Sequence, residues 1–241
     1  MKIQKLYSYT RRAVDDYHMI MPGDKIAIGI SGGKDSLTLL YALAGLQRFY
    51  PHPFELIAVT VDLGYDNFAL SPIRELCATL QIPYHVIQTQ IKDIVFSKHA
   101  ESSPCSLCAK LRKGALNDAV KELGSNKVAY AHHRDDIIET MFLSLIFEGR
   151  FHSFSPSTYL DRTGLTVIRP MMYVPEVDVI GFMHKMNLPV VKNPCPVDGQ
   201  TKRQYAKDMI QQINQSNPGA KDRIFTAIQN ANIEGWPPLH S

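Results

Sequence analysis

Short apolar runs alternate with helical segments along this chain, and this alternation limits the possible folds more than any other feature. Between the runs, apolar residues at helical spacing and helix-start residues predict helices. Strands that alternate with helices predict an α/β fold with a doubly wound parallel sheet of five strands. The predicted strands are residues 26–30, 54–62, 84–89, 127–131 and 165–170.

The alternation covers only the middle of the chain, so three parts are predicted. Residues 1–24 have apolar residues at helical spacing and predict an N-terminal helix that ends at Pro22 and Gly23. Residues 25–191 carry the strand and helix alternation. Residues 192–241 read as helical and predict a C-terminal extension.

Composition excludes several classes of protein. The chain has 241 residues, of which 45% are hydrophobic and 20% charged, as in soluble globular proteins. No apolar run approaches the ~20 residues that span a membrane, and the N-terminus has no apolar signal core, so we expect a cytoplasmic protein without a membrane partner. The four cysteines then favour metal or redox chemistry over disulfides. A net charge of +3 permits a polyanionic partner.

The most specific motif is SGGKDS, which directly follows the first predicted strand. Ligands of such sheets bind at the carboxyl ends of the strands. The two glycines let the backbone approach a phosphate, the following helix N-terminus attracts anions, and the lysine adds positive charge. We therefore predict a phosphate-binding loop rather than an ordinary glycine-rich turn. The expected nucleotide contacts are Ser31, Gly32, Gly33, Lys34, Asp35 and Ser36.

This loop differs from a Walker A motif. That motif would need glycine in place of Ile28 and serine or threonine in place of Asp35. A carboxylate beside phosphates is better suited to holding a metal ion than to contacting the phosphates directly.

Four cysteines offer several interpretations. Cys105 and Cys108 form a CxxC pair, for which structural zinc and thioredoxin-like redox chemistry are alternatives. A redox role fits poorly because the pair opens a helix late in the sheet. Cys195 is the obvious third thiol, and three thiols suit a cluster with one iron left open. Cys77 lies on an apolar helical stripe and is predicted to be a core residue.

SGGKDS resembles the PP-loop of the ATP pyrophosphatase superfamily. The resemblance implies a sheet of order 3-2-1-4-5 and cleavage of ATP between its α and β phosphates. It also implies adenylation of a carbonyl oxygen, followed by displacement of AMP by a nucleophile. The end of the second strand, at Asp62, is then expected near the adenosine.

Two further segments, PCSLCAKLRKG and AHHRDDIIET, extend the likeness. With SGGKDS and a Pro-Cys pair near the C-terminal end, they resemble the TtcA family of tRNA 2-thiocytidine synthetases over essentially the whole chain. The resemblance implies a 4Fe–4S cluster on Cys105, Cys108 and Cys195, whose open iron holds the sulfide for the activated base. It also implies functional roles for Arg112 and Asp136.

The same resemblance implies partners: tRNA, a sulfur donor (a cysteine desulfurase or inorganic sulfide) and a second copy of the chain in a homodimer. Two positions depart from the family pattern. Ala131 stands where the family usually has glycine beside the nucleotide, and Asp198 stands where an additional thiol is usual.

Other polar residues leave alternatives open. His132 and His133 are either acid–base groups or residues that shape the loop after the fourth strand. Asp135 is predicted to cap the following helix, and Asp136 to serve magnesium. A set of basic residues near the C-terminus forms either a solvated face or, as the resemblance favours, a contact for tRNA phosphates. It comprises Lys192, Lys202, Arg203, Lys207, Lys221 and Arg223.

The predicted function is ATP-dependent thiolation of a tRNA pyrimidine, expected to be cytidine. ATP and Mg²⁺ dock on the PP-loop, and Lys34 and Arg112 offset the charge that develops as pyrophosphate leaves. Two alternatives come from other classes. A PP-loop ligase acting on a small molecule has no use for three placed thiols, whereas a sulfurtransferase acting on another base or a small molecule stays an open alternative. A zinc-binding RNA module leaves SGGKDS unexplained.

Overall fold

The sheet contains five parallel strands in the predicted order. The computed structural model describes residues 2–66, 68–96, 104–191, 194–195, 202–231 and 233–237. Within these residues the strand order is β3-β2-β1-β4-β6-β5, and β6 is the predicted fifth strand. The doubly wound α/β class is therefore confirmed. The strands are β1 Lys25–Gly29, β2 Glu55–Asp62, β3 Tyr84–Gln88, β4 Lys127–Ala129, β5 Ser157–Leu160 and β6 Leu165–Ile168.

The predicted total of five strands is wrong, because a sixth strand extends the sheet. β5 pairs antiparallel with β6, and Gly164 has a positive φ of 70° in the turn between them. β5 has only four residues, and none of them is fully buried. So short an edge strand has no continuous apolar run by which a sequence pattern could reveal it.

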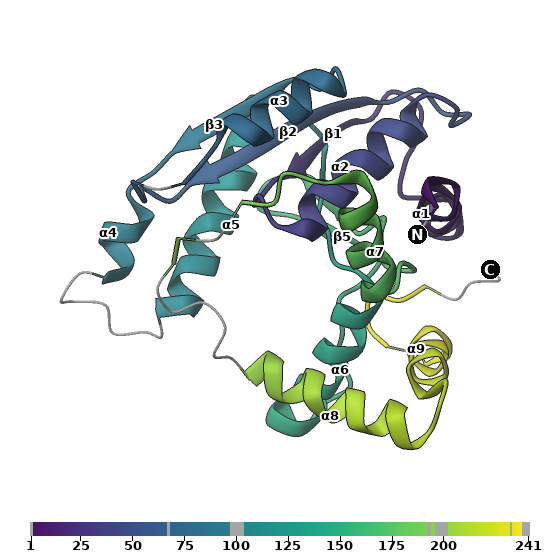
Figure 1. Ribbon diagram of the computed structural model, residues 1–241. Coiled ribbons are helices and arrows are strands. Elements are labelled where there is room, and N and C mark those ends of the chain that lie inside the picture. The colour runs from purple at the N-terminus through teal and green to yellow at the C-terminus, as the bar shows by residue number, and fades with distance from the viewer. Residues whose placement is uncertain are drawn as a thin grey trace.

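Helices cover both faces of the sheet (Figure 1). Along β1, the side chains of Ile26 and Ile28 join the core beneath α2, α3 and α7, whereas Ala27 joins the core beneath α4 and α5. This alternation explains why the strands read as continuous apolar runs. The helices between the N-terminal and C-terminal segments are α2 Lys34–Gln47, α3 Ser71–Thr79, α4 Ile91–Phe96, α5 Pro104–Glu122, α6 Arg134–Glu148 and α7 Glu176–Met186.

The C-terminal helices lie away from the sheet. α8 (Lys202–Ser216) and α9 (Ala220–Asn230) both contact α6, as Figure 1 shows in yellow-green and yellow. Their apolar residues, among them Ile210 and Phe225, join the core that includes α2 and α7. No helix among the described residues is long and apolar enough to cross a membrane.

The N-terminal helix is shorter than predicted. α1 spans Ile3–Asp16 and ends well before Pro22. The chain turns at His18, which has a positive φ of 47°, and the backbone N–H of Met19 donates to Val14 O at 3.0 Å. Because Met19 and Ile20 are buried beyond this turn, tertiary packing ends the helix earlier than the apolar spacing indicates.

A buried ion pair fastens this turn to the sheet. Asp24 Oδ2 lies 2.7 Å from Lys127 Nζ and accepts from the backbone N–H of Met21 at 2.7 Å. Its other oxygen accepts from Asn126 Nδ2 at 2.7 Å. Burial alone would raise the pKa of Asp24, but the hydrogen bonds from Lys127, Met21 and Asn126 lower it below its ordinary value.

Asp24→Ala is expected to lower the free energy of unfolding by about 3–5 kcal/mol, because it leaves the Lys127 ammonium buried without its partner. Urea unfolding at neutral pH measures this loss. Since the folded pKa of Asp24 is lowered, its contribution is present above the unfolded pKa and is lost as pH falls through the folded pKa. The gap between variant and wild type should therefore narrow in acid. Asp118→Ala, at an exposed site on α5, is the control; equal losses in both variants would contradict this account.

Candidate active site

The PP-loop connects β1 to α2, and hydrogen bonds to its own serine side chains fix its conformation. The Ser31 backbone N–H donates to Ser36 Oγ at 3.2 Å, and the Gly33 N–H donates to Ser31 Oγ at 3.3 Å. Gly32 has a positive φ of 81°, which favours glycine. Gly33 is the N-cap of α2, and no side chain caps this helix. The first N–H groups of α2 are therefore available to an anion.

The charged residues of the loop interact with each other and with α7. Lys34 Nζ lies 3.1 Å from Asp35 Oδ1 and 3.3 Å from Glu176 Oε1. Burial would lower the pKa of Lys34, but these two carboxylates raise it above its ordinary value, so the cation persists. Asp35 Oδ1 is buried, and no described donor is aligned for a hydrogen bond to it. The loop thus presents a fixed cation beside a buried carboxylate oxygen that has an ion-pair contact but no aligned hydrogen bond.

The segment after β4 forms the wall of the site opposite the PP-loop. A capping box at the start of α6 shapes this segment. The His133 backbone N–H donates to Asp136 Oδ2 at 3.0 Å, and the Asp136 N–H donates to His133 Nδ1 at 3.3 Å. His133 therefore shapes the start of α6, as one of its two interpretations held. The other oxygen of Asp136 accepts from Arg203 Nη1 at 3.0 Å.

The prediction that Asp135 caps α6 is wrong. Asp135 is buried, and its Oδ2 accepts from the backbone N–H of Glu176 at 2.7 Å, at the start of α7. Its Oδ1 accepts from Lys221 Nζ at 2.7 Å. Burial would raise the pKa of Asp135, but these hydrogen bonds lower it. Asp135 thus joins α6, α7 and α9, while His133 is the N-cap of α6 and Asp136 completes its capping box.

The basic residues near the C-terminus are neither a simple solvated face nor all free for a ligand. Arg203 pairs with Asp136 and lies 3.3 Å from Glu139 Oε2, and Lys207 lies 2.7 Å from Glu176 Oε2. With the Lys221 pair, these contacts fasten α8 and α9 to the walls of the site. Neither sequence interpretation anticipated this role. Lys192 lies outside the described residues.

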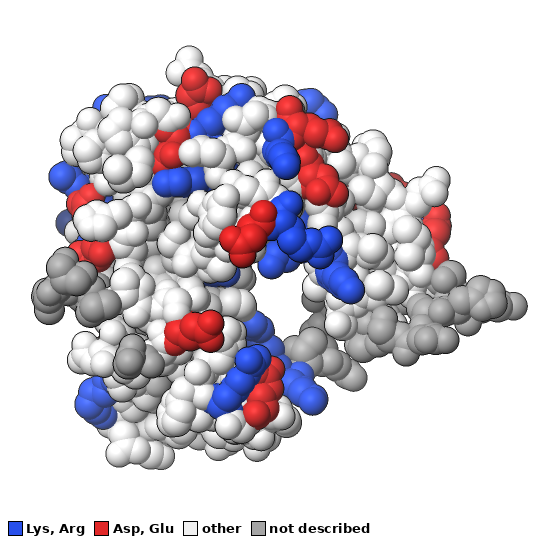
Figure 2. Space-filling model, turned by 180° about the vertical axis from the view of Figure 1, so that it is seen from behind, with Lys and Arg blue, Asp and Glu red and all other residues white. Residues whose placement is uncertain are grey.

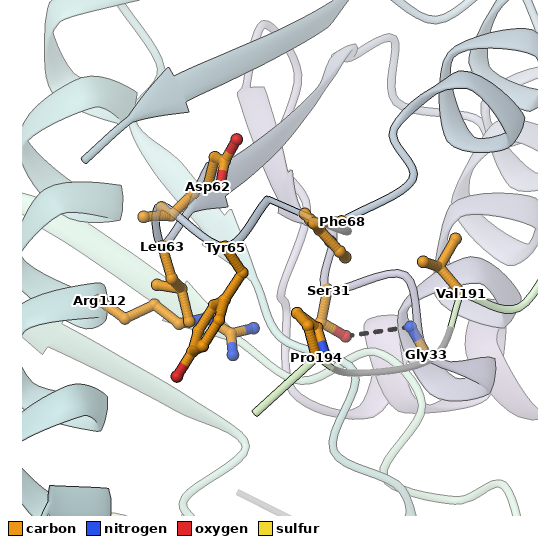
Figure 3. A pocket seen from close by; sticks show the side chains of 10 residues that line it. Ser31, Gly33, Asp62, Leu63, Tyr65, Phe68, Arg112, Val191 and Pro194 are labelled. Atoms are coloured by element: carbon orange, nitrogen blue, oxygen red, sulfur yellow. Dashed lines mark hydrogen bonds between the residues drawn. The ribbon is translucent and has the colours of Figure 1, made fainter. Parts of the chain in front are cut away.

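A cavity of about 290 Å³ opens beside the PP-loop at the end of β2 (Figure 3). Asp62 lies in its wall, and its Oδ1 accepts from the Gly64 N–H at 3.0 Å. The structure thus brings Asp62 and the loop together around one cavity. Its lining residues are Ser31, Gly33, Val61, Asp62, Leu63, Tyr65, Phe68, Arg112, Val191 and Pro194.

A second cavity of about 580 Å³ lies over the ends of β1, β4 and β6. Asp35, Ser36 and Ala131 line it, and so do several cations. Figure 2 shows Lys and Arg side chains along the edge of a hollow in one face of the molecule. Ser31 and Arg112 line both cavities, so the two spaces adjoin at these residues. The cationic lining residues of the second cavity are Arg112, Lys113, Arg169 and Arg203.

The three predicted cluster cysteines come together near Arg112. Cys105 and Cys108 lie in the first turns of α5, and Cys195 approaches from the C-terminal segment. Burial raises the pKa of the Cys108 thiol, the Arg112 guanidinium lowers it, and the nearby Cys195 and Cys105 raise it further. Tyr65 hydrogen-bonds Cys195; burial first and then this bond raise the pKa of Tyr65 to about 12. These effects place the three thiols in one neighbourhood beside Arg112.

These three thiols are soft donors, of the kind that iron–sulfur clusters take. Among the described residues, no group of three Cys, His, Asp or Glu side chains has the spacing that one metal ion requires. In a cluster each thiolate binds a different iron, so the thiolates are spread more widely. Cys77 is fully buried, and burial raises the pKa of its thiol to about 11, which confirms it as a core residue. Asp198 lies outside the described residues.

Several site residues gave no sequence pattern. Glu176 and Phe154 reach the site from segments far along the chain, and Tyr65 comes from a loop without a recognisable motif. Only their tertiary neighbours identify them.

Comparison with known proteins agrees with this geometry. The model of the PP-loop domain family (ATP_bind_3) matches residues 4–213. A tRNA-cytidine(32) 2-sulfurtransferase of Pelobacter propionicus is 40% identical over 222 residues, which cover 91% of this chain and 82% of the relative. Another protein of that name, from Geobacter sulfurreducens, is 38% identical and is covered over 91% of its length, with 95% of this chain aligned.

Among solved structures, the U34-tRNA thiolase NcsA from Methanococcus maripaludis, which contains a [4Fe-4S] cluster, has the same fold. It superposes with a TM-score of 0.75 at 22% identity, over 94% of this chain and 77% of that one. Family model and relatives both span most of the chain. The chain therefore belongs to the PP-loop family and, within it, to the family of the tRNA-cytidine(32) 2-sulfurtransferases.

Proposed function

We propose that this chain is an ATP-dependent tRNA sulfurtransferase that activates the C2 oxygen of a cytidine and replaces it with sulfur. Its relatives carry this activity in their names, with position 32 of tRNA as the target. The observation that carries the proposal is the position of Arg112. This residue lines both cavities and lies close enough to Cys108 to lower its pKa.

The two cavities suit the two substrates. ATP would place its adenosine in the cavity with Asp62 and its phosphates on the open N–H groups of α2. The α-phosphate then lies toward Ser31 and Arg112, where the second cavity begins. A pyrimidine in the second cavity presents its C2 oxygen to this phosphate. Lys34 and Arg112 offset the negative charge that develops as pyrophosphate leaves.

Asp35 fits a magnesium ion. Its buried Oδ1 lacks a hydrogen bond from the described residues, and carboxylate oxygens are preferred magnesium ligands. Asp136 is the second candidate for a magnesium ligand, because it lines the same cavity as Asp35. Its hydrogen-bond partner, Arg203, is a cation that the phosphates of ATP would also attract. We propose that these two carboxylates position Mg²⁺ and ATP together.

Cys105, Cys108 and Cys195 would hold a 4Fe–4S cluster, which supplies sulfur at the iron that lacks a thiolate ligand. Arg112 stands between this group and the reacting phosphate, so both half-reactions take place around one guanidinium. The sulfur donor, a homodimeric state, the cytoplasmic location and the three-part division of the chain stay predictions from the sequence.

The direct test uses anaerobically purified protein with its cluster reconstituted. Incubation with ATP, sulfide and unmodified tRNA is expected to give 2-thiocytidine at position 32, with equimolar AMP and pyrophosphate. Nucleoside mass spectrometry identifies the product. Formation of 2-thiouridine alone, or ATP cleavage with ammonia incorporated instead of sulfur, would count against the proposal.

A further inference from the structure

One wall of the second cavity has no role in the chemistry described above. It is formed by Phe154, Arg169 and His132, which follows β4. The rings of His132 and Phe154 are stacked, with centroids 4.1 Å apart and planes inclined by 10°. Such a stack fixes the plane of the imidazole, in which its two nitrogens lie.

Arg169 determines which nitrogen of His132 carries the proton. Its Nε–H donates to His132 Nδ1 at 3.1 Å, and Nη1 donates to Ser155 O at 2.5 Å. A guanidinium can only donate, so Nδ1 is an acceptor without a proton, and the proton of the neutral ring is on Nε2. Burial and the Arg169 charge lower the pKa of His132 to about 3, which keeps the ring neutral.

The Nε2–H donor of His132 has no acceptor among the described residues. His132 lines the cavity, and its Nε2 keeps contact with solvent. A ligand in the cavity can therefore accept from this N–H. A buried Tyr130 hydroxyl in the same lining also lacks a hydrogen-bond partner. Because that hydroxyl is buried, His132 is the group of this wall that can meet a ligand.

The geometry points to His132 as the residue that selects cytosine over uracil, by donating from Nε2–H to the N3 atom of the base. In cytosine N3 is an acceptor, whereas in uracil it carries a hydrogen and is a donor. N3 adjoins C2, the carbon of the oxygen to be activated, so the contact also orients that oxygen. Two donors facing each other leave a buried N–H unsatisfied, which disfavours uracil. This inference rests on the proposed function.

The test compares two anticodon stem-loop RNAs that differ only by C or U at the target position. Wild-type protein with its cluster and ATP is expected to bind the C-containing RNA roughly 10- to 100-fold more tightly, as measured by fluorescence anisotropy. His132→Phe keeps a ring on Phe154 but loses the donor, so the ratio should fall close to one while ATP affinity is retained. Tyr130→Phe is the matched control, because a hydroxyl both donates and accepts and its loss should leave the ratio unchanged.

Retention of the C preference in His132→Phe would overturn this inference about specificity. It would not bear on the proposed thiolation function. Absence of thiolation in the wild type would instead overturn the proposed function. Nitrogen-15 NMR of wild-type protein tests the same idea without any substitution. The expected spectrum has an unprotonated Nδ1 across neutral pH and an Nε2 resonance that shifts with the C-containing RNA. A protonated Nδ1 would equally exclude the proposal.

Discussion

Lys34→Ala and Asp35→Ala are each expected to lower the rate of tRNA-dependent pyrophosphate release by roughly 100- to 1,000-fold. Lys34 is a cation fixed between Asp35 and Glu176 at the start of α2, where the leaving pyrophosphate develops charge. Asp35 has a buried carboxylate oxygen without an aligned hydrogen bond, which suits magnesium. Both effects belong to the adenylation step, so turnover should fall more than RNA affinity.

The fold should tolerate both changes. Lys34 and Asp35 are partly exposed, and such ion pairs contribute little to stability. The melting temperature is therefore expected to fall by no more than about 4 °C. Lys185→Ala, at the exposed end of α7, controls for loss of a lysine charge and should leave pyrophosphate release unchanged. Full activity in either loop variant, or a loss explained by unfolding, would refute the assignment of the loop.

The sequence predicted what depends on local pattern. Buried parallel strands are continuous apolar runs, so β1, β2, β3, β4 and β6 were found, and with them the strand ends at which the site lies. The loop residues follow the first of these strands, whereas the role of Asp62 was implied by the family resemblance. β5 was missed because a short edge strand buries little, and the end of α1 was misplaced because the turn at His18 depends on tertiary packing.

Long-range polar contacts could not be read from the chain. Adjacent carboxylates at the start of a helix look alike in sequence, yet Asp136 caps α6 while Asp135 binds Lys221, 86 positions away. The basic C-terminal residues seemed free for the same reason. Cys195 was joined to the CxxC pair by counting thiols and by family resemblance, since no local pattern links the two segments.

Cys105→Ser, Cys108→Ser and Cys195→Ser are each expected to lose most of the iron and acid-labile sulfide and to stop thiolation. A serine hydroxyl is a harder and far less acidic ligand than a thiol, so it replaces a cluster thiolate poorly. ATP binding should survive in all three variants, because the PP-loop follows a different strand and its hydrogen bonds involve none of these cysteines. Iron analysis, visible absorption and nucleotide titration measure these properties separately.

Cys77→Ser is the control that distinguishes a ligand from a buried thiol. Cys77 is fully enclosed in the core beneath α3, so its serine variant should keep the iron and lose about 1–3 kcal/mol of stability for burying an unpaired hydroxyl. The opposite pattern is therefore expected from the other three cysteines: iron lost, with the nucleotide site intact. A cluster that survived Cys195→Ser would show that its third ligand comes from elsewhere. The contact between Cys195, Tyr65 and Cys108 would then be packing rather than coordination.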